Sequence, residues 1–191
     1  HYKTTVPVIT REFPTEVIDG LPESKVNPPA EVYARINSDN VKVAQARAFF
    51  DERDDFLQEF IWPSNGRVSG VYGSRRILNG EPKRPHYGMD IANVVGTDVM
   101  APAAGVVRLA ETDMYYTGGT IIIDHGYGLT TTFMHMSQLN VEVGDYVKKA
   151  EKIGEIGATG RATGPHLDWR LNLGKTRLDP QLIISDVPTY F

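Results

Sequence analysis

From Gly66 onward, glycines divide the sequence into short runs rich in β-branched and aromatic residues, and this pattern limits the possible folds more than any other feature. Short strands separated by turn residues favour an antiparallel sheet or sandwich over alternating strands and helices. We therefore predict a mainly β domain over residues 62–191, built on a small antiparallel sheet or sandwich. The predicted strands cover residues 68–72, 89–92, 98–101, 105–110, 120–124, 129–135, 146–147, 152–156 and 166–171.

Residues 30–61 contain neither glycine nor proline and predict an N-terminal helix. Their apolar residues recur at steps of three, four or seven, the spacing of one helix face: Val32, Ile36, Val43, Ala46 and Phe50. We expect this face to pack on the sheet or to mediate contacts. The Ser-Asp-Asn sequence at 38–40 is a weak point where the helix could break, and Trp62-Pro63 ends it.

Residues 1–29 predict an irregular N-terminal extension, because Asn27-Pro28-Pro29 is a stop signal. Residues 4–10 are β-prone and predict an edge strand. The chain starts with His1 and carries no signal-peptide pattern, so we expect a mature or trimmed sequence whose signal peptide has been removed.

The chain has no cysteine, which excludes disulfides, iron–sulfur clusters, thiolate zinc sites and cysteine nucleophiles. Any metal must therefore be held mainly by histidine, aspartate or glutamate. A net charge of −4 and a pI of about 5.7 argue against nucleic acid as a partner. No apolar run approaches the ~18 residues of a membrane-spanning helix.

His86 and Asp90 form a His-x3-Asp pair in a sequence with proline and glycine around it, where a loop or strand entry is expected. Such a pair can chelate a metal through an imidazole nitrogen and a carboxylate oxygen. Taken alone the pair is a weak signal, and an ordinary surface turn is the simpler interpretation.

The sequence 166–171 alternates between two faces of a predicted strand, because side chains two residues apart point the same way. One face carries the apolar side chains of a core. The other carries His166, Asp168 and Arg170, which taken alone could be a solvated surface or a site.

His135 ends the predicted strand at 129–135. A lone histidine there is more often structural than catalytic. His125 lies in a predicted hairpin turn, and we expect a structural role for it.

The order of these three motifs, ending in Gly-Pro-His-Leu-x-Trp at 164–169, resembles the lysostaphin-type or LytM-domain metallopeptidases, which are zinc endopeptidases of bacterial cell-wall peptides. Residues 66–75, 96–107, 143–147 and 153–157 match the family's other strands and hairpins, so the resemblance covers about residues 62–180. It implies a small antiparallel sheet with a groove across it.

The resemblance implies a role for each motif residue. His86 and Asp90 match metal ligands, and His135 and His166 match the catalytic histidines. Asp168 stands where the family has the third metal ligand, a histidine. With Asp168 as a ligand, two carboxylates would formally cancel the charge of a divalent cation and make it a poorer Lewis acid. We expect zinc, with Mn²⁺ or another divalent cation as the alternative.

We further expect loops near 75–81 and 114–117 to form the walls of the groove. Five residues are predicted to lie along it: Arg75, Tyr115, Tyr116, Arg161 and Arg170. The two last arginines could bind peptide carboxylates, although a solvated surface would explain them equally well.

The resemblance thus implies a zinc metalloendopeptidase that cleaves peptide cross-links of peptidoglycan in the periplasm or outside the cell. The alternative is a weakly active or inactive module that binds cell wall or activates another cell-wall hydrolase. A biotinyl- or lipoyl-type carrier domain is less favoured, because Lys148, Lys149 and Lys152 do not lie in a carrier context and the histidines would have no role.

Overall fold

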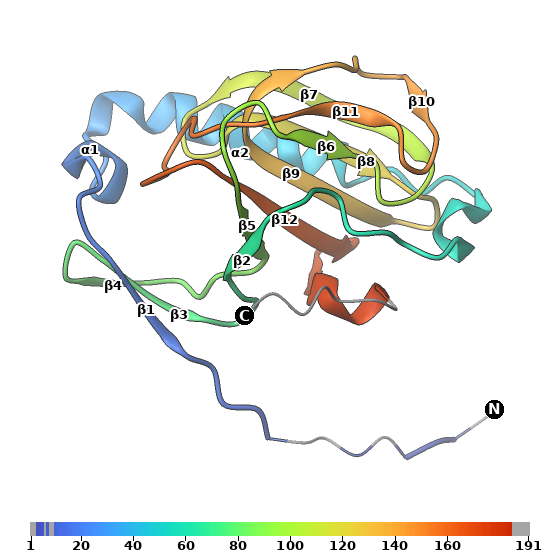
Figure 1. Ribbon diagram of the computed structural model, residues 1–191, viewed down its shortest axis with the longest axis horizontal. Helices are drawn as coiled ribbons and strands as arrows, with labels where there is room; N and C mark the ends of the chain where they lie inside the picture. Colours follow the sequence, from blue (N-terminus) through green and yellow to red (C-terminus); the bar gives the residue numbers. More distant parts are fainter. Residues whose placement is uncertain (1–2, 6, 8–9, 185–191) are drawn as a thin grey trace.

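The computed structural model describes residues 3–5, 7 and 10–184. These residues form a small three-stranded sheet, a ten-stranded main sheet and one helix of 14 residues (Figure 1). The helices are α1 (Glu23–Val26) and α2 (Tyr33–Ala46), with 3-10 turns at Ala30–Val32, Asp54–Leu57 and Pro180–Ile183. The strands are β1 (Thr15–Ile18), β2 (Arg67–Gly70), β3 (Arg75–Leu78), β4 (Glu81–Lys83), β5 (Met89–Ala92), β6 (Asp98–Met100), β7 (Gly105–Met114), β8 (Gly118–Asp124), β9 (Leu129–Leu139), β10 (Tyr146–Val147), β11 (Lys152–Ile156), β12 (His166–Leu173) and β13 (Thr176–Leu178).

The main sheet has the strand order β10-β7-β8-β9-β12-β5-β2, and every neighbouring pair along it is antiparallel. β11 pairs with β6 and β9, and β13 pairs with β12. The predicted mainly β fold with a preceding helix is confirmed. The predicted strands at 89–92, 146–147 and 152–156 coincide with β5, β10 and β11.

The core lies on one face of the main sheet. Leu167, Trp169 and Leu171 on β12 are each at most 1% exposed, and the first two belong to the largest buried apolar cluster. The alternation read from the sequence is therefore observed, and it leaves His166, Asp168 and Arg170 on the opposite face.

That opposite face is partly covered by α2, which runs behind the main sheet in Figure 1. Val43 and Ala46 pack on Leu109, Met114 and Ile122 of the sheet. The helix does not break at 38–40, because the Asp39 side chain is oriented inward, where it accepts a hydrogen bond from the backbone N–H of Tyr115 at 2.7 Å.

The prediction that helix continues to residue 61 is wrong, because α2 ends at Ala46. Beyond it the backbone bonds to the β8–β9 turn instead: Tyr127 N–H donates to the Asp51 carbonyl at 2.8 Å, and Phe56 N–H donates to the His125 carbonyl at 2.9 Å. Arg53 also pairs with buried Asp124 at 2.8 Å. These tertiary contacts outweigh helix propensity.

The small sheet has the order β1-β3-β4, with β1 parallel to β3. It extends away from the main sheet in Figure 1. β1 lies later than the predicted edge strand at 4–10: residues 4, 5, 7 and 10 form no strand, and residues 6, 8 and 9 lie outside the described part. No helix in the described residues is long and apolar enough to cross a membrane.

Candidate active site

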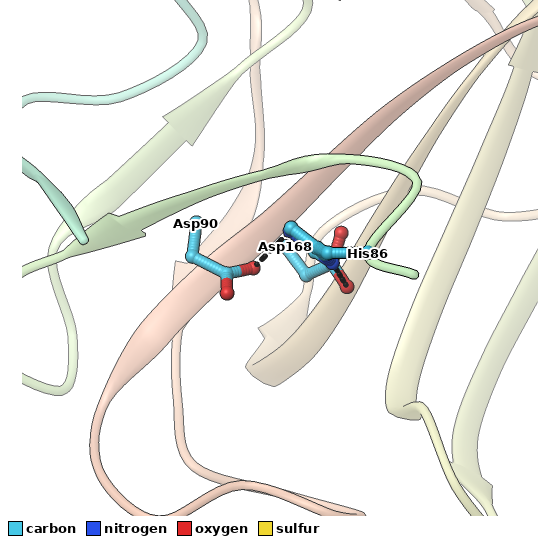
Figure 2. Close-up of side chains that lie close together, drawn as sticks. All are labelled: His86, Asp90 and Asp168. Carbon is cyan, nitrogen blue, oxygen red and sulfur yellow. Dashed lines mark ion pairs between the residues drawn. The ribbon is translucent and has the colours of Figure 1, made fainter. Parts of the chain in front are cut away.

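Three side chains from two neighbouring strands and the loop before them converge on one point (Figure 2). Asp90 on β5 and Asp168 on β12 are direct cross-strand partners. His86 comes from the loop between β4 and β5, where its backbone bonds to Ser74 and Gly73 at 2.9 and 2.8 Å. The loop is thereby held over the two carboxylates.

The donor atoms of these three residues fit a divalent cation. One atom from each lies within 4.8 Å of the others, and all three residues are buried. His86 Nε2 lies 3.0 Å from Asp90 Oδ1, and His86 Nδ1 lies 3.9 Å from Asp168 Oδ2. Both ring nitrogens of His86 and Oδ1 of Asp90 are nevertheless buried without a hydrogen-bond partner in the described residues. Since buried polar atoms are normally satisfied, such a cluster suits a shared cation.

Each carboxylate is also bound by an arginine. Arg170 donates from Nε and Nη2 to the two oxygens of Asp168, at 3.0 and 2.7 Å. Arg76 donates to Oδ2 of Asp90 and pairs through Nε with Glu16 at 3.2 Å. Burial by itself raises the pKa of Asp168, but Arg170 and His86 outweigh it and hold that pKa well below its usual range.

The same balance holds the pKa of Asp90 below its usual range. Burial and Asp168 raise it, and His86 and Arg76 outweigh them. Both aspartates are therefore ionised and available as ligands at neutral pH.

His135 and His166 lie beside this cluster with ring centroids 4.8 Å apart. Nδ1 of His135 bonds to the carbonyl of Thr159 at 2.8 Å, and Nδ1 of His166 bonds to the carbonyl of Gly164 at 2.8 Å. A carbonyl only accepts, so each Nδ1 carries the hydrogen. In the neutral rings Nε2 is then left as an acceptor, and Nε2 of His166 lies 4.0 Å from Oδ1 of Asp90.

His135 does not end its strand, since β9 continues to Leu139. It instead has a φ of 65° at the point where β9 leaves β12 and turns toward β11. A positive φ is costly for a residue other than glycine, and such strain is concentrated at functional sites. Burial and the neighbouring His166 lower the pKa of His135 to about 4, so its ring is neutral at pH 7.

Gly88, within the His-x3-Asp motif, makes room for the cluster. A Cβ at this position would lie 2.4 Å from Oδ1 of Asp168 and 2.6 Å from Cγ of Arg170. Only glycine lets the loop approach the carboxylate this closely.

A groove of about 390 Å³ opens beside Asp90, His135 and His166. β1 contributes to its wall through Glu16, Val17 and Ile18. Further parts of the wall come from Arg76 and Leu78 on β3, from Ser69, and from the loop 161–165.

The model of peptidase family M23 matches residues 84–180, a span that contains every residue of the cluster. The chain belongs to peptidase family M23. This confirms the resemblance described above.

Among its M23 relatives is the peptidoglycan DD-endopeptidase ShyA of Vibrio cholerae, 32% identical over 86% of this chain and 38% of that protein. A solved M23-family structure from Pseudomonas aeruginosa is 34% identical, with a TM-score of 0.72 over 81% of this chain and 63% of that one. A zinc-containing peptidase from Vibrio cholerae is 27% identical, with a TM-score of 0.60 over 69% and 41%. The chain spans well under half the length of the curated relatives that it matches.

The structure of this M23 chain brings the five motif residues together but separates the predicted groove residues. Arg161 lines the groove, and its guanidinium lies 4.7 Å from the ring centroid of Tyr116. Tyr115 is buried against α1, donating to the Ser24 carbonyl at 2.7 Å, and Arg75 is exposed on β3 outside the groove. Arg170 is engaged by Asp168 and does not line the groove.

Sequence reasoning did not single out Arg76, Glu16 or the carbonyl of Thr159. Arg76 lay within the predicted groove wall at 75–81, but nothing in the sequence marks it as a partner of Asp90, 14 residues away. Glu16 reaches the site from the N-terminal extension through the parallel β1–β3 pairing, which no local pattern predicts.

Proposed function

We propose that this M23 chain is a metal-dependent endopeptidase that hydrolyses peptide cross-links of peptidoglycan, with His86, Asp90 and Asp168 holding zinc. The observation that carries the proposal is the buried convergence of these three side chains, in which both ring nitrogens of His86 and Oδ1 of Asp90 have no hydrogen-bond partner in the described residues. The M23 membership and the name of the ShyA relative support the substrate class. A bound zinc ion would supply Lewis acidity toward a peptide carbonyl and toward water.

His135 and His166 would handle the protons. The carbonyl on each Nδ1 fixes the tautomer, so in the neutral ring Nε2 is the proton acceptor. One imidazole can take a proton from the attacking water and pass it to the leaving amine, which keeps the hydrolysis balanced. The other can orient the water or the developing oxyanion.

Arg170 would compensate for the aspartate at position 168. Two carboxylate ligands would place two negative charges beside the cation. Arg170 partly neutralises the charge of Asp168, and Arg76 partly neutralises that of Asp90. The charge cancellation expected from the sequence is thereby reduced. We regard Arg170 as a residue that positions Asp168 rather than one that contacts substrate.

Arg161 would recognise a carboxylate of the peptide substrate. It lines the groove, donates to the Lys25 carbonyl at 3.3 Å, and forms no ion pair within the described residues. Arginine suits this role because its planar guanidinium group can donate two parallel hydrogen bonds to a carboxylate.

One observation favours the alternative of a regulatory module that binds cell wall without cleaving it. Arg76 and Arg170 already neutralise Asp90 and Asp168, so the cluster could persist without a cation. Either activity places the chain where peptidoglycan lies, in the periplasm or outside the cell.

Elemental analysis and digestion of purified peptidoglycan decide between the two. The proposal expects about one zinc per chain and new amine and carboxyl ends detected by mass spectrometry. Both chelation of the zinc and the substitution His166→Ala should abolish the formation of these new ends. Absence of metal after zinc loading, or intact cross-links beside an active M23 control, would favour the regulatory module.

A further inference from the structure

A second hollow, of about 470 Å³, lies on the α2 side of the molecule, between the end of α2 and the β12–β13 turn. It shares no lining residue with the groove beside His166. Gly174 at its rim is six residues along the chain from Asp168, which corresponds to roughly 20 Å of strand. The hollow therefore opens at a different place from the groove, although Arg47 in its lining lies near Arg170, the partner of Asp168.

Three cationic side chains line this hollow, and no acidic side chain of the described residues does: Arg47, Lys175 and Arg177. Within the described residues none of the three forms an ion pair: 10–184 supply no carboxylate within 4 Å. The chain as a whole carries a net charge of −4, so this concentration of positive charge runs against its overall balance.

Arg47 is the most unusual of the three. Its Nη2 donates to Oγ1 of Thr132 at 2.9 Å, and its Nε is buried without a partner in the described part of the chain. Burial, with Arg170 and Arg177 nearby, lowers the pKa of Arg47 to about 10. Burying an unpaired charge costs stability, and an anionic ligand would remove that cost.

The remaining lining is mostly apolar, with Asn40 as a polar side chain. Phe49 and Phe50 are 44% and 67% exposed, with Val43 beside them. The volume is in the range of sites for small organic ligands and exceeds what a lone inorganic anion needs. At Gly174 a Cβ would meet nothing within 4 Å among the described residues, so there is space beside this backbone, whose N–H donates to the Gly128 carbonyl at 2.8 Å.

We propose that this hollow binds an acidic peptide segment, with a carboxylate on Arg47 and an apolar side chain against Phe49 and Phe50. Charge complementarity selects the anion, since an arginine fork fits a carboxylate. The exposed aromatic lining and the volume of the hollow favour a peptide over a bare anion. The proposal needs neither a bound metal nor the proposed endopeptidase activity, so it stands or falls separately from them.

The test is an NMR titration of the ¹⁵N-labelled chain with N-acetyl-Leu-Glu-Leu-Glu. We expect shifts confined to the amides of Phe49, Phe50 and Gly174 and to the Arg47 Nε–H signal. The neutral peptide N-acetyl-Leu-Gln-Leu-Gln-amide and inorganic phosphate are titrated in parallel. No shift at these signals, equal binding of the neutral peptide, or phosphate binding as tightly as the acidic peptide would each overturn the proposal.

Arg47→Gln should weaken binding of the acidic peptide about 10-fold or more, because a charge-assisted hydrogen bond is lost. Lys149→Gln, an exposed site outside the hollow, makes the same change in net charge and should leave binding unchanged. If Arg47→Gln does not fold, Lys175→Gln at the exposed rim replaces it, with an expected loss of about 2–3-fold. Equal loss in the Lys149 variant would show nonspecific attraction and contradict the site.

Discussion

Asp90 and Asp168 are direct partners across the antiparallel β5–β12 ladder. Like charges directly opposite one another destabilise a sheet, and these two carboxylates are also buried. Arg76, Arg170 and His86 surround the pair. Each carboxylate is compensated by the guanidinium group of one arginine, Arg76 for Asp90 and Arg170 for Asp168. The atoms of His86 and Asp90 that have no hydrogen-bond partner in the described residues remain available for a metal ion.

Asp168→Ala should weaken zinc affinity at least ~10-fold, because losing even an outer partner of a metal ligand has that effect. Isothermal titration with zinc measures it. Asp19→Ala, at an exposed aspartate outside the cluster, is the control for the charge change. Unchanged affinity in the Asp168 variant would mean that another group, with His166 the first to test, completes the metal site.

Arg170→Gln should lower the free energy of unfolding by about 2 kcal/mol in the absence of metal. The value is below the ~3–5 kcal/mol of a fully buried pair because the Arg170 side chain keeps 27% exposure. Saturating zinc should recover part of this loss, since the cation takes over the charge compensation of Asp168.

Urea unfolding with and without zinc measures both effects for Arg170→Gln. Arg67→Gln, at an exposed position without an ion pair in the described residues, is the matched control. If zinc stabilises the parent and the Arg170 variant equally, the arginine does not act through Asp168.

Gly88→Ala should reduce both stability and zinc affinity. The added Cβ would meet Oδ1 of Asp168 at 2.4 Å, so the loop carrying His86 must move away from the carboxylate. Gly164→Ala is the control, because a Cβ there meets nothing within 4 Å. Thermal unfolding and zinc titration of the two variants should separate them clearly, and equal behaviour would contradict the close approach.

Stability should fall as the pH drops from about 6.5 toward 4. Burial lowers the pKa of His125 to about 4, whereas an unfolded histidine titrates near 6.5. The unfolded state therefore binds the proton first, and the neutral ring's contribution is complete above pH 6.5 and lost on acidification, by ~3 kcal/mol. His135 acts in the same direction.

The measurement is the urea midpoint at pH 7 and pH 5, with the ring signals of the histidines followed by NMR. His125 bonds to the Ala104 carbonyl and to Thr131 at 2.7 and 2.8 Å, so its ring should titrate well below pH 6. A normal titration of His125 would refute the buried neutral form.

Local patterns in the sequence were sufficient to predict most strands and to single out the five motif residues. Strand β12 shows why: its alternation places Leu167 and Trp169 in the core and His166 and Asp168 on the other face, a consequence of two-residue periodicity alone. The motif order then indicated the family, and the family implied the roles.

Contacts between distant segments decided the rest. α2 stops at Ala46 because the following residues bond to the β8–β9 turn instead of continuing the helix. The helical periodicity of the sequence cannot predict these long-range hydrogen bonds. Arg76 reaches Asp90, and Arg170 turns to Asp168 instead of the groove. Arg47 is left without a counterion among the described residues. Such pairings depend on which side chains the folded sheet brings within a few ångströms, and spacing along the chain does not contain that information.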